Sequence, residues 1–243
     1  MRFVDSHLHL DSPDAGDIVK FAASAGVLLL GCGVDEKSSR ALLELAEGAP
    51  GNVRPFVGVH PSEAEGGGDL GWLGEASKKA AGMGEIGLDP SYSAVSRGSA
   101  QMRVFQAQIE AAEAEGKPVQ VHSRKAEAEC LELLGASRVP RVLMHWLESE
   151  EALPKAMERG YYVSFGPALL YSRRLQRIAA RADLSLVLLE SDAPVRYAPL
   201  GGAGGPGLVP SVAFRLAELL GEPFQDTLVR CTENSLRFLG EKG

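Results

Sequence analysis

The chain has 243 residues, of which 45% are hydrophobic and 23% are charged, and its formal net charge is -7. This is the composition of a folded globular protein, and it excludes a disordered, collagen-like or purely coiled-coil chain. A single α/β barrel needs about 250 residues. We therefore expect one domain over residues 1–243.

Several further classes of protein are excluded by charge, hydropathy and cysteine content. The apolar run near Val27–Leu30 is far shorter than the roughly 18 residues of a membrane helix, and Asp5 stands where a signal peptide needs an apolar segment. Cys32, Cys130 and Cys231 are odd in number and far apart, which argues for a reducing compartment and predicts a cytoplasmic protein. The acidic balance argues against coating nucleic acid by bulk charge and leaves a local basic site open.

Short runs rich in Val, Ile, Leu and Phe alternate with stretches of helical period along the whole chain. Eight strands each followed by a helix favour the α/β class and a (β/α)8 TIM barrel. An open doubly wound sheet, which has the same alternation with fewer strands, is the alternative. The predicted strands are Arg2–Asp5, Gly26–Cys32, Arg54–His60, Gly82–Leu88, Pro118–His122, Arg141–His145, Tyr161–Phe165 and Leu186–Ser191.

Helices and loops follow from the same pattern. A helix is predicted over Gln101–Glu115, ended by Gly116, and a last helix over Gln225–Leu239. Two glycine-rich stretches, Glu63–Asp69 and Gly201–Gly207, are predicted to be flexible loops. The second lacks the GK[ST] ending and the strand-to-helix context of a phosphate-binding loop.

All five histidines of the chain fall at the ends of predicted strands, and two carboxylates occupy equivalent places. In a barrel the carboxyl ends of the strands converge on the face where barrel enzymes bind their substrates. A single histidine there is usually a hydrogen-bonded residue without a catalytic role, but five together indicate a metal centre. The converging residues are His7 and His9 on the first strand, His60 on the third, Glu85 on the fourth, His122 on the fifth, His145 on the sixth and Asp192 after the eighth.

The HxH spacing of His7 and His9 has a mechanical reason. Side chains two apart on a strand point the same way, so both rings can clasp one cation, and Asp5 shares this parity as a candidate orienting group. Four histidines and two carboxylates exceed what one tetrahedral ion uses. They suit two divalent ions bridged by a carboxylate and a hydroxide. Zinc, manganese and magnesium all suit this ligand set, so the metal is left open.

These residues lie in segments that resemble the TatD family of metal-dependent deoxyribonucleases, within the amidohydrolase-like barrel superfamily. The resemblance spans essentially the whole chain. The matching segments are DSHLHLD at 5–11, VGVHP at 57–61, GEIGLD at 84–89, KPVQVHSR at 117–124, LMH at 143–145, ESDAP at 190–194 and TENSLRFLG at 232–240.

The resemblance implies a role for each of the converging residues. His60 would sit beside the metals and contact the scissile phosphate or the leaving group. Glu85 stands where many other binuclear members of the superfamily have a carboxylated lysine, which favours the TatD branch over amide- and ester-cleaving relatives. The implied ligands are His7, His9 and Asp192 for the first metal and His122 and His145 for the second, with Glu85 bridging the pair.

The chain departs from the family pattern in loops that roof the site. The sixth-strand histidine is followed by Trp146 and Leu147, where the family commonly has Cys-Phe-Ser-Gly. GLDP at 87–90 replaces the commoner GLDY, and the segment VRYAPLGGAGGPGLVP after the eighth strand blurs the family's motifs. All ligand positions are retained, so these departures concern the substrate preference and leave the hydrolytic chemistry intact.

The favoured function is hydrolysis of a phosphodiester in nucleic acid, with single-stranded DNA or DNA ends as substrate and no obligate protein partner. Two ions would lower the pKa of a bridging water and offset the negative charge of the transition state. Asp192 can accept the proton of the water, and His60 can act as a general acid or contact the phosphate. Arg124 and Arg196, just beyond the ligands, are candidates for phosphate contacts.

Two alternatives stay open from the sequence. The same centre can act on another bond, as in an aminoacyl-tRNA deacylase or a small amidohydrolase. A non-catalytic nucleic-acid-binding scaffold is the second alternative, but aromatic residues make up 6% of the chain, with Trp72 and Trp146 as its indoles. A base-stacking platform therefore has little support from composition. The choice between DNA and RNA, between attack at an end and internal attack, and the oligomeric state are not determined.

Overall fold

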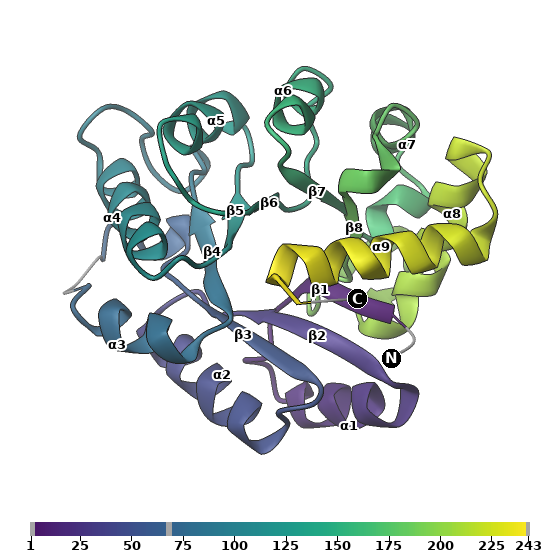
Figure 1. The fold of residues 1–243 in the computed structure, drawn as a ribbon, viewed down its shortest axis with the longest axis horizontal. Helices are drawn as coiled ribbons and strands as arrows, with labels where there is room; N and C mark the ends of the chain where they lie inside the picture. The colour runs from purple at the N-terminus through teal and green to yellow at the C-terminus, as the bar shows by residue number, and fades with distance from the viewer. Residues whose placement is uncertain (1–2, 67–69, 242–243) are drawn as a thin grey trace.

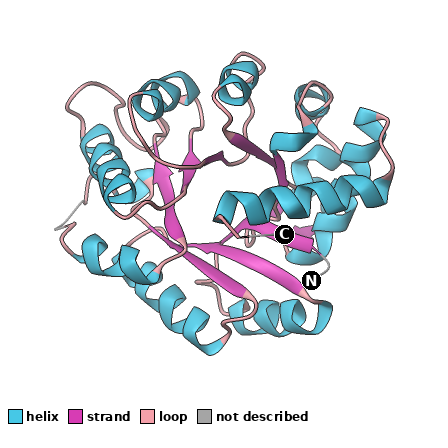
Figure 2. Ribbon diagram, in the orientation of Figure 1, coloured by secondary structure: helices cyan, strands magenta, loops and turns pink. Residues whose placement is uncertain are grey.

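The computed structural model describes residues 3–66 and 70–241. Eight parallel strands form one sheet in the order β1 to β8, and helices surround it (Figures 1 and 2). The strands are β1 (Phe3–Leu8), β2 (Val27–Cys32), β3 (Val53–Val57), β4 (Gly82–Gly87), β5 (Val119–His122), β6 (Val142–Met144), β7 (Tyr162–Phe165) and β8 (Val187–Leu189).

The predicted barrel is confirmed, since all eight predicted strands are present with ends shifted by a few residues. The predicted strand end at Arg2 lies outside the described residues. The helices are α1 (Ala15–Ala25), α2 (Glu36–Gly48), α3 (Trp72–Lys79), α4 (Ala100–Ala114), α5 (Glu127–Gly135), α6 (Ala152–Glu158), α7 (Arg173–Ala179), α8 (Val209–Leu220) and α9 (Phe224–Leu239). Beyond α4, Gly116 has a φ of 62°, which confirms its predicted place at the helix end.

The seam between β8 and β1 is joined just beyond the end of β8. The backbone N–H of Asp192 donates to the carbonyl of His7 (3.0 Å), and that of His9 donates to the carbonyl of Ala193 (2.7 Å). The buried carboxylate of Asp5 accepts a hydrogen bond from the backbone N–H of Ser191 (2.8 Å). Asp5 therefore fixes the seam at the point where two expected metal ligands approach each other.

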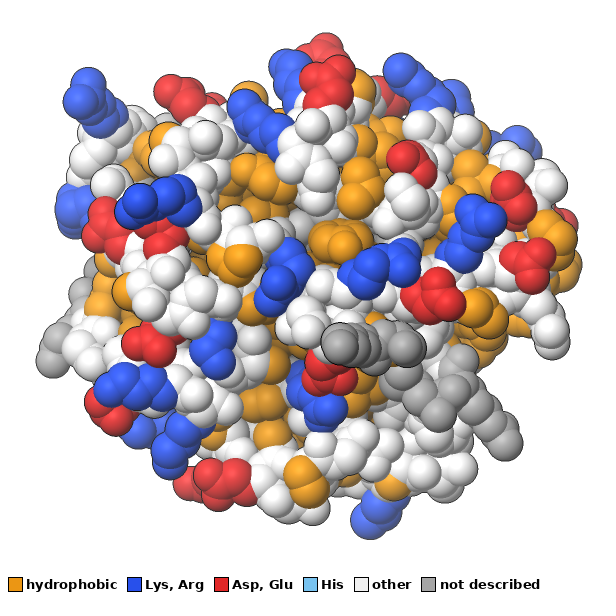
Figure 3. All heavy atoms as spheres, in the orientation of Figure 1, with side chains coloured by type: hydrophobic (Ala, Val, Ile, Leu, Met, Phe, Trp, Pro, Cys, Tyr) orange, Lys and Arg blue, Asp and Glu red, His pale blue; other side chains and the backbone are white. Residues whose placement is uncertain are grey.

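The opposite end of the barrel is closed by α9, which crosses the ring of strands in Figure 1. Leu236 and Phe238 of α9 pack against side chains inside the barrel, and the ring of Phe238 stacks on Phe56 with centroids 5.8 Å apart. Arg141, just before β6, donates through Nε to the carbonyl of Phe238 (2.6 Å). Lysine, arginine, aspartate and glutamate side chains are intermixed on this face of the molecule (Figure 3).

The two stretches predicted to be glycine-rich loops differ in how they compare with the structure. Residues 67–69 of the first stretch lie outside the described residues. The second contains more regular structure than expected, because β10 (Gly202–Ala203) pairs antiparallel with β9 (Arg196–Tyr197). Gly204 permits a close approach here, since a Cβ on it would lie 2.5 Å from the carbonyl oxygen of Ser191. In the described residues, no helix is long and apolar enough to cross a bilayer.

Candidate metal centre

All seven residues that the sequence singled out for the metal centre meet at the carboxyl end of the strands. His7 lies in β1, Glu85 in β4 and His122 at the end of β5. His9 and His145 directly follow β1 and β6, and His60 and Asp192 lie three residues beyond β3 and β8. A cavity of about 530 Å³ opens over this cluster, and its walls include His9, His60, Glu85, His122, His145 and Asp192.

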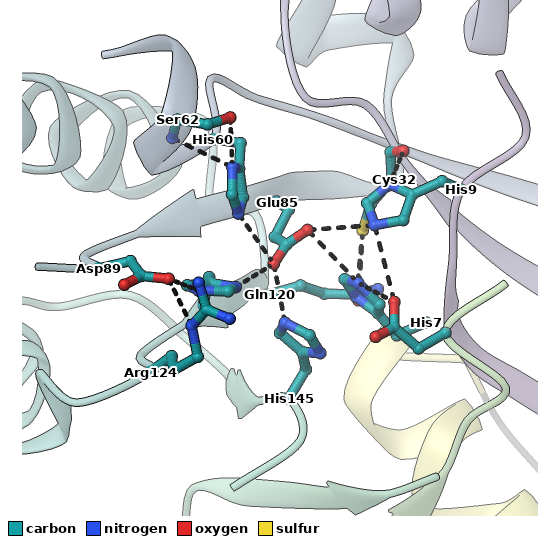
Figure 4. A network of polar contacts seen from close by, with 12 residues as sticks. His7, His9, Cys32, His60, Ser62, Glu85, Asp89, Gln120, Arg124 and His145 are labelled. Carbon is teal, nitrogen blue, oxygen red and sulfur yellow. Dashed lines mark hydrogen bonds and ion pairs between the residues drawn. The ribbon is translucent and has the colours of Figure 1, made fainter. Parts of the chain in front are cut away.

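The carboxylate of Glu85 lies at the centre of the cluster (Figure 4). Its Oε1 lies 2.7 Å from Nδ1 of His122 and 2.8 Å from Nε2 of His145. Its Oε2 lies 3.2 Å from Nε2 of His9 and 3.6 Å from Nε2 of His7. One oxygen therefore faces each of the two histidine pairs, as a carboxylate shared between two cations requires.

Asp192 completes the side of the cluster that contains the HxH pair. Its Oδ1 lies 3.8 Å from Nε2 of both His7 and His9. Its backbone has a φ of 47°, a left-handed conformation that a residue with a Cβ adopts only at a cost. Donor atoms of His7, His9 and Asp192 lie within 4.8 Å of one another, as do those of His7, Glu85 and His145 and those of His60, Glu85 and His122.

A second layer of polar groups turns each ring nitrogen toward the centre. Nδ1 of His7 contacts Oε1 of Gln120 (2.7 Å), and Nδ1 of His9 contacts the carbonyl oxygen of Cys32 (3.1 Å). Because each Nδ1 faces an acceptor, the lone pair of the neutral ring is on Nε2, the nitrogen that faces Glu85. Nε2 of His7 is buried and has no hydrogen-bond partner in the described part of the chain, so the site fits a cation there.

His122 is oriented in the same manner by a hydrogen-bonded carboxylate, whereas the carboxylate behind His145 lies beyond hydrogen-bond distance. Nε2 of His122 lies 2.9 Å from Oδ2 of Asp89, and Nδ1 of His145 lies 3.7 Å from Oε1 of Glu190. Each ring presents its other nitrogen to Glu85. A carboxylate behind a ligating histidine fixes the tautomer and raises the basicity of the ligand.

His60 has the opposite arrangement. Its Nδ1 accepts a hydrogen bond from the backbone N–H of Ser62 (3.1 Å), so a neutral ring carries its proton on Nε2, which faces Oε1 of Glu85 at 3.6 Å. Burial lowers the pKa of His60 to about 4. The ring is therefore neutral and offers an N–H to the cavity, which suits a hydrogen-bond donor to a phosphate or leaving-group oxygen better than a ligand.

The ionisation of the cluster shows how strongly it favours positive charge. Burial alone would raise the pKa of Glu85, but His145, His60 and His122 outweigh burial and hold it well below its usual range. Burial likewise opposes a charged His9, but its hydrogen bond and charge interaction with Glu85 and the charge of Asp192 raise its pKa to about 9. In the metal-free protein, the rings of His9 and His145, whose pKa values are both raised, therefore carry protons where cations would be bound.

Of the two predicted phosphate-contacting arginines, one lines the cavity. Arg124 does so, with its Nε 2.7 Å from Oδ2 of Asp89 and about half of its side chain exposed. Arg196 is exposed in β9 and does not contribute to the described cavity wall, so this placement gives its expected role no support. Two further cationic residues line the cavity, Lys125 and Arg174, and neither was predicted from the sequence.

Other residues missed from the sequence share one signal. Gln120 and Glu190 stand two residues before His122 and Asp192, so strand parity directs them toward the barrel interior beneath those ligands. Asp89 could be noticed as the carboxylate of the GLDP segment. The partners of Asp89 could not be predicted, because they depend on how the loop after β4 meets β5.

One glycine is required by the approach of β4 to β5. Gly87 has a φ of 143°, and a Cβ on it would lie 1.9 Å from the carbonyl oxygen of His122. The same carbonyl accepts a hydrogen bond from the backbone N–H of Leu88 (3.0 Å). The glycine of the GEIGLD segment therefore lets the strand carrying Glu85 lie against the strand carrying His122.

Comparisons with known proteins identify relatives of this chain. The human protein named Deoxyribonuclease TATDN3 is 26% identical over 256 residues, covering 96% of this chain and 93% of its own length. A Musicola paradisiaca protein named 3'-5' ssDNA/RNA exonuclease TatD is 33% identical over 181 residues, covering 70% of this chain and 67% of its own. The crystal structure of YJJV, a TatD homologue from Escherichia coli K12, has a TM-score of 0.86 and 26% identity and covers 98% of this chain and 97% of its own. Residues 4–240 match the family described as TatD related DNase, and the chain belongs to that family.

Proposed function

We propose that this protein is a deoxyribonuclease of the metal-dependent hydrolase type, with two divalent ions in the described cluster and a phosphodiester of DNA as substrate. The observation that carries the proposal is the position of Glu85, which presents one oxygen to His122 and His145 and the other to His7 and His9. The names of the relatives support a nucleic acid as substrate.

The division of ligands between the ions is part of the proposal. One ion would be held by His7, His9 and Asp192. The other ion would be held by His122 and His145, and Glu85 would bind both ions. Zinc, manganese and magnesium are the candidates. When bound, two such ions would lower the pKa of a water between them and offset charge on the phosphate.

The residues of the chain supply the proton transfers that hydrolysis needs. Water adds to phosphorus and one P–O bond breaks, so the water must lose a proton and the leaving oxygen must gain one. Asp192, whose pKa burial raises to about 6, accepts the first proton. Asp192 then returns that proton to the leaving oxygen, and the neutral ring of His60 presents Nε2–H to the cavity and stabilises the leaving oxygen with a hydrogen bond.

Arg124 is proposed to bind a phosphate oxygen. Its Nε is held by Asp89, which directs the guanidinium along the cavity wall. The terminal nitrogens of the guanidinium have no ion-pair partner in the described residues. They are therefore available for a bidentate contact.

The proposal further includes one domain over residues 1–243 and a cytoplasmic setting. One continuous barrel in the described residues supports the first. Three buried, unpaired cysteines support the second.

The test is a substrate panel assayed with defined metals on chelator-treated protein. Single-stranded DNA, duplex DNA, RNA, an aminoacyl ester and a small amide are compared with zinc, manganese and magnesium added separately. We expect cleavage of DNA after metal is restored and none in chelator. Cleavage of the acyl substrates alone would make the protein a deacylase or amidohydrolase, and metal binding without any cleavage would make it a scaffold.

Variants test the mechanism behind that activity. Glu85→Gln should lower kcat/KM by more than the roughly 10–100-fold that is typical of residues behind the ligands. Glu127→Gln is the matched control, because Glu127 lines the cavity without contacting the cluster. Cleavage that persists when His122→Ala and Glu85→Gln are combined would overturn the two-metal mechanism.

A further inference from the structure

Trp146 is the aromatic side chain best placed to meet a substrate base. It follows His145 directly and lines the cavity over the metal centre. Its backbone has a φ of 43°, so the chain turns sharply immediately after the ligand. The low aromatic content of the chain gave no support for base stacking, but the fold brings one of its two indoles to the cavity.

The indole is held in place before any ligand binds. Its ring lies against that of the buried Tyr197, with centroids 5.8 Å apart and an interplanar angle of 27°. Its Nε1 donates to Oε1 of Glu148 (2.9 Å), and its backbone N–H donates to Oγ of Ser164 (3.2 Å). Because these contacts fix the ring, a base that stacks on it loses little binding free energy to ordering the protein.

Tyr92, the other aromatic residue among the described cavity-lining residues, is half exposed, but its ring already has two partners. The Arg124 guanidinium lies 5.6 Å from the centroid of the Tyr92 ring, within the range of a cation–π contact. The edge-on contact of this ring with His60 has a centroid distance of 5.5 Å. The Arg124 contact takes one face of the Tyr92 ring, whereas Tyr197 is not among the described cavity-lining residues and leaves the cavity side of Trp146 open.

Cationic groups accompany the indole in the cavity wall. Lys125 has no carboxylate within ion-pair distance among the described residues, and Arg124 uses its Nε alone on Asp89. An aromatic surface beside unpaired cations is the combination that binds a base and its phosphates together. A nucleotide unit of a strand supplies both chemistries.

We propose that Trp146 stacks on the nucleobase beside the scissile phosphodiester and makes the enzyme favour a purine over a pyrimidine at that position. This rests on the proposed phosphodiesterase function and adds a specificity-determining residue to it. Purines present the larger π face, so stacking on a fixed indole favours them. Trp146 belongs to the HWLES segment, where this chain departs from the commoner family sequence.

The test uses short single-stranded oligodeoxyadenylates, intact or with one base replaced by an abasic residue. Wild-type protein should cleave the phosphodiester beside the abasic residue about tenfold more slowly than the same bond in the intact strand. Trp146→Ala should cleave the intact strand with a similar loss and show no further loss at the abasic residue. Trp146→Phe should retain most of the discrimination. The preference for adenine over thymine at this position should disappear in Trp146→Ala.

A second readout does not depend on cleavage. Trp72→Phe leaves Trp146 as the remaining tryptophan of the chain. In chelator, oligodeoxyadenylate should quench the fluorescence of this variant, and an abasic strand of equal length should quench it less. Phe214→Ala, which removes an exposed aromatic ring of α8 outside the cavity wall, is the control and should cleave both strands as wild type does.

The outcomes separate this inference from the function it rests on. A wild-type protein that cleaves no DNA with any metal would overturn both. DNA cleavage with equal rates on intact and abasic strands, or an unchanged abasic penalty in Trp146→Ala, would overturn the stacking role alone. If Trp146→Ala does not fold, the wild-type and Trp146→Phe measurements still decide the question.

Discussion

The ring of His122 lies between two carboxylates, with Nδ1 2.7 Å from Oε1 of Glu85 and Nε2 2.9 Å from Oδ2 of Asp89. The same Asp89 oxygen accepts a hydrogen bond from Nε of Arg124 (2.7 Å). Burial opposes a charged Asp89, but hydrogen bonds from His122 and Ser91 hold its pKa below the usual range. An ionised Asp89 therefore joins a proposed metal ligand to a proposed phosphate-binding arginine.

Asp89→Asn should weaken metal binding by about 10–100-fold, because the ring of His122 loses the charged acceptor that fixes its tautomer. Metal affinity is measured by titration of chelator-treated protein, followed by kcat and KM. Asp17→Asn, on the exposed face of α1, is the matched control. Unchanged metal affinity in Asp89→Asn would contradict the orienting role.

Arg141→Ala should reduce the free energy of unfolding by about 1.5–3 kcal/mol, the range for a hydrogen bond from a charged group. Arg141 holds the end of α9 through the carbonyl of Phe238. Arg40→Ala, which removes an exposed ion pair with Glu36 on α2, should cost no more than about 1 kcal/mol. Chemical denaturation distinguishes the two, and equal losses would show that α9 is not held chiefly by Arg141.

Gly87→Ala should destabilise the protein by at least about 3 kcal/mol, because the new Cβ would meet the carbonyl of His122 and the backbone conformation is one that alanine avoids. Gly16→Ala in α1, where a Cβ would meet nothing within 4 Å, should stabilise by about 0.5–1 kcal/mol. Denaturant unfolding of both variants is the measurement. A tolerated Gly87→Ala with normal metal binding would contradict the close approach of β4 to β5.

The cysteines should be unreactive in the native protein. Burial raises the pKa of Cys231 to about 12 and that of Cys130 well above its usual value. At pH 8 the thiolate fraction of Cys231 is on the order of 10⁻⁴, and it rises only as the pH approaches the raised pKa. A thiol reagent should therefore react with three cysteines after denaturation and with none promptly before it. Rapid modification of the native protein would show that one of them is accessible.

The proposed metal ligands could be predicted from the sequence because each lies in or just beyond a strand. Once the alternation of strands and helices predicts a barrel, the carboxyl ends of the strands must converge, and His7, Glu85 and His122 must converge with them. The two-residue spacing of HxH and the GEIGLD segment also indicated the direction in which these side chains point. The predicted ends of the strands were less accurate, since β3 ends at Val57 and His60 follows it in extended backbone at the N-cap of a short 3-10 helix.

The residues around the ligands required the tertiary structure. Arg124 and Arg196 looked alike in sequence, but the hairpin of β9 and β10 places Arg196 on the outside while Asp89 holds Arg124 at the cavity.

The sequence by itself determined the barrel, the convergence of seven residues and the family, because strand period and strand order are local properties that repeat along the chain. The tertiary structure decided which nitrogen of each histidine faces the centre, which arginine lines the cavity and where Trp146 lies. Those outcomes depend on contacts between loops that are distant in the sequence, such as Trp146 with Tyr197 and His122 with Asp89. No local pattern specifies such contacts, since they form only when the barrel closes.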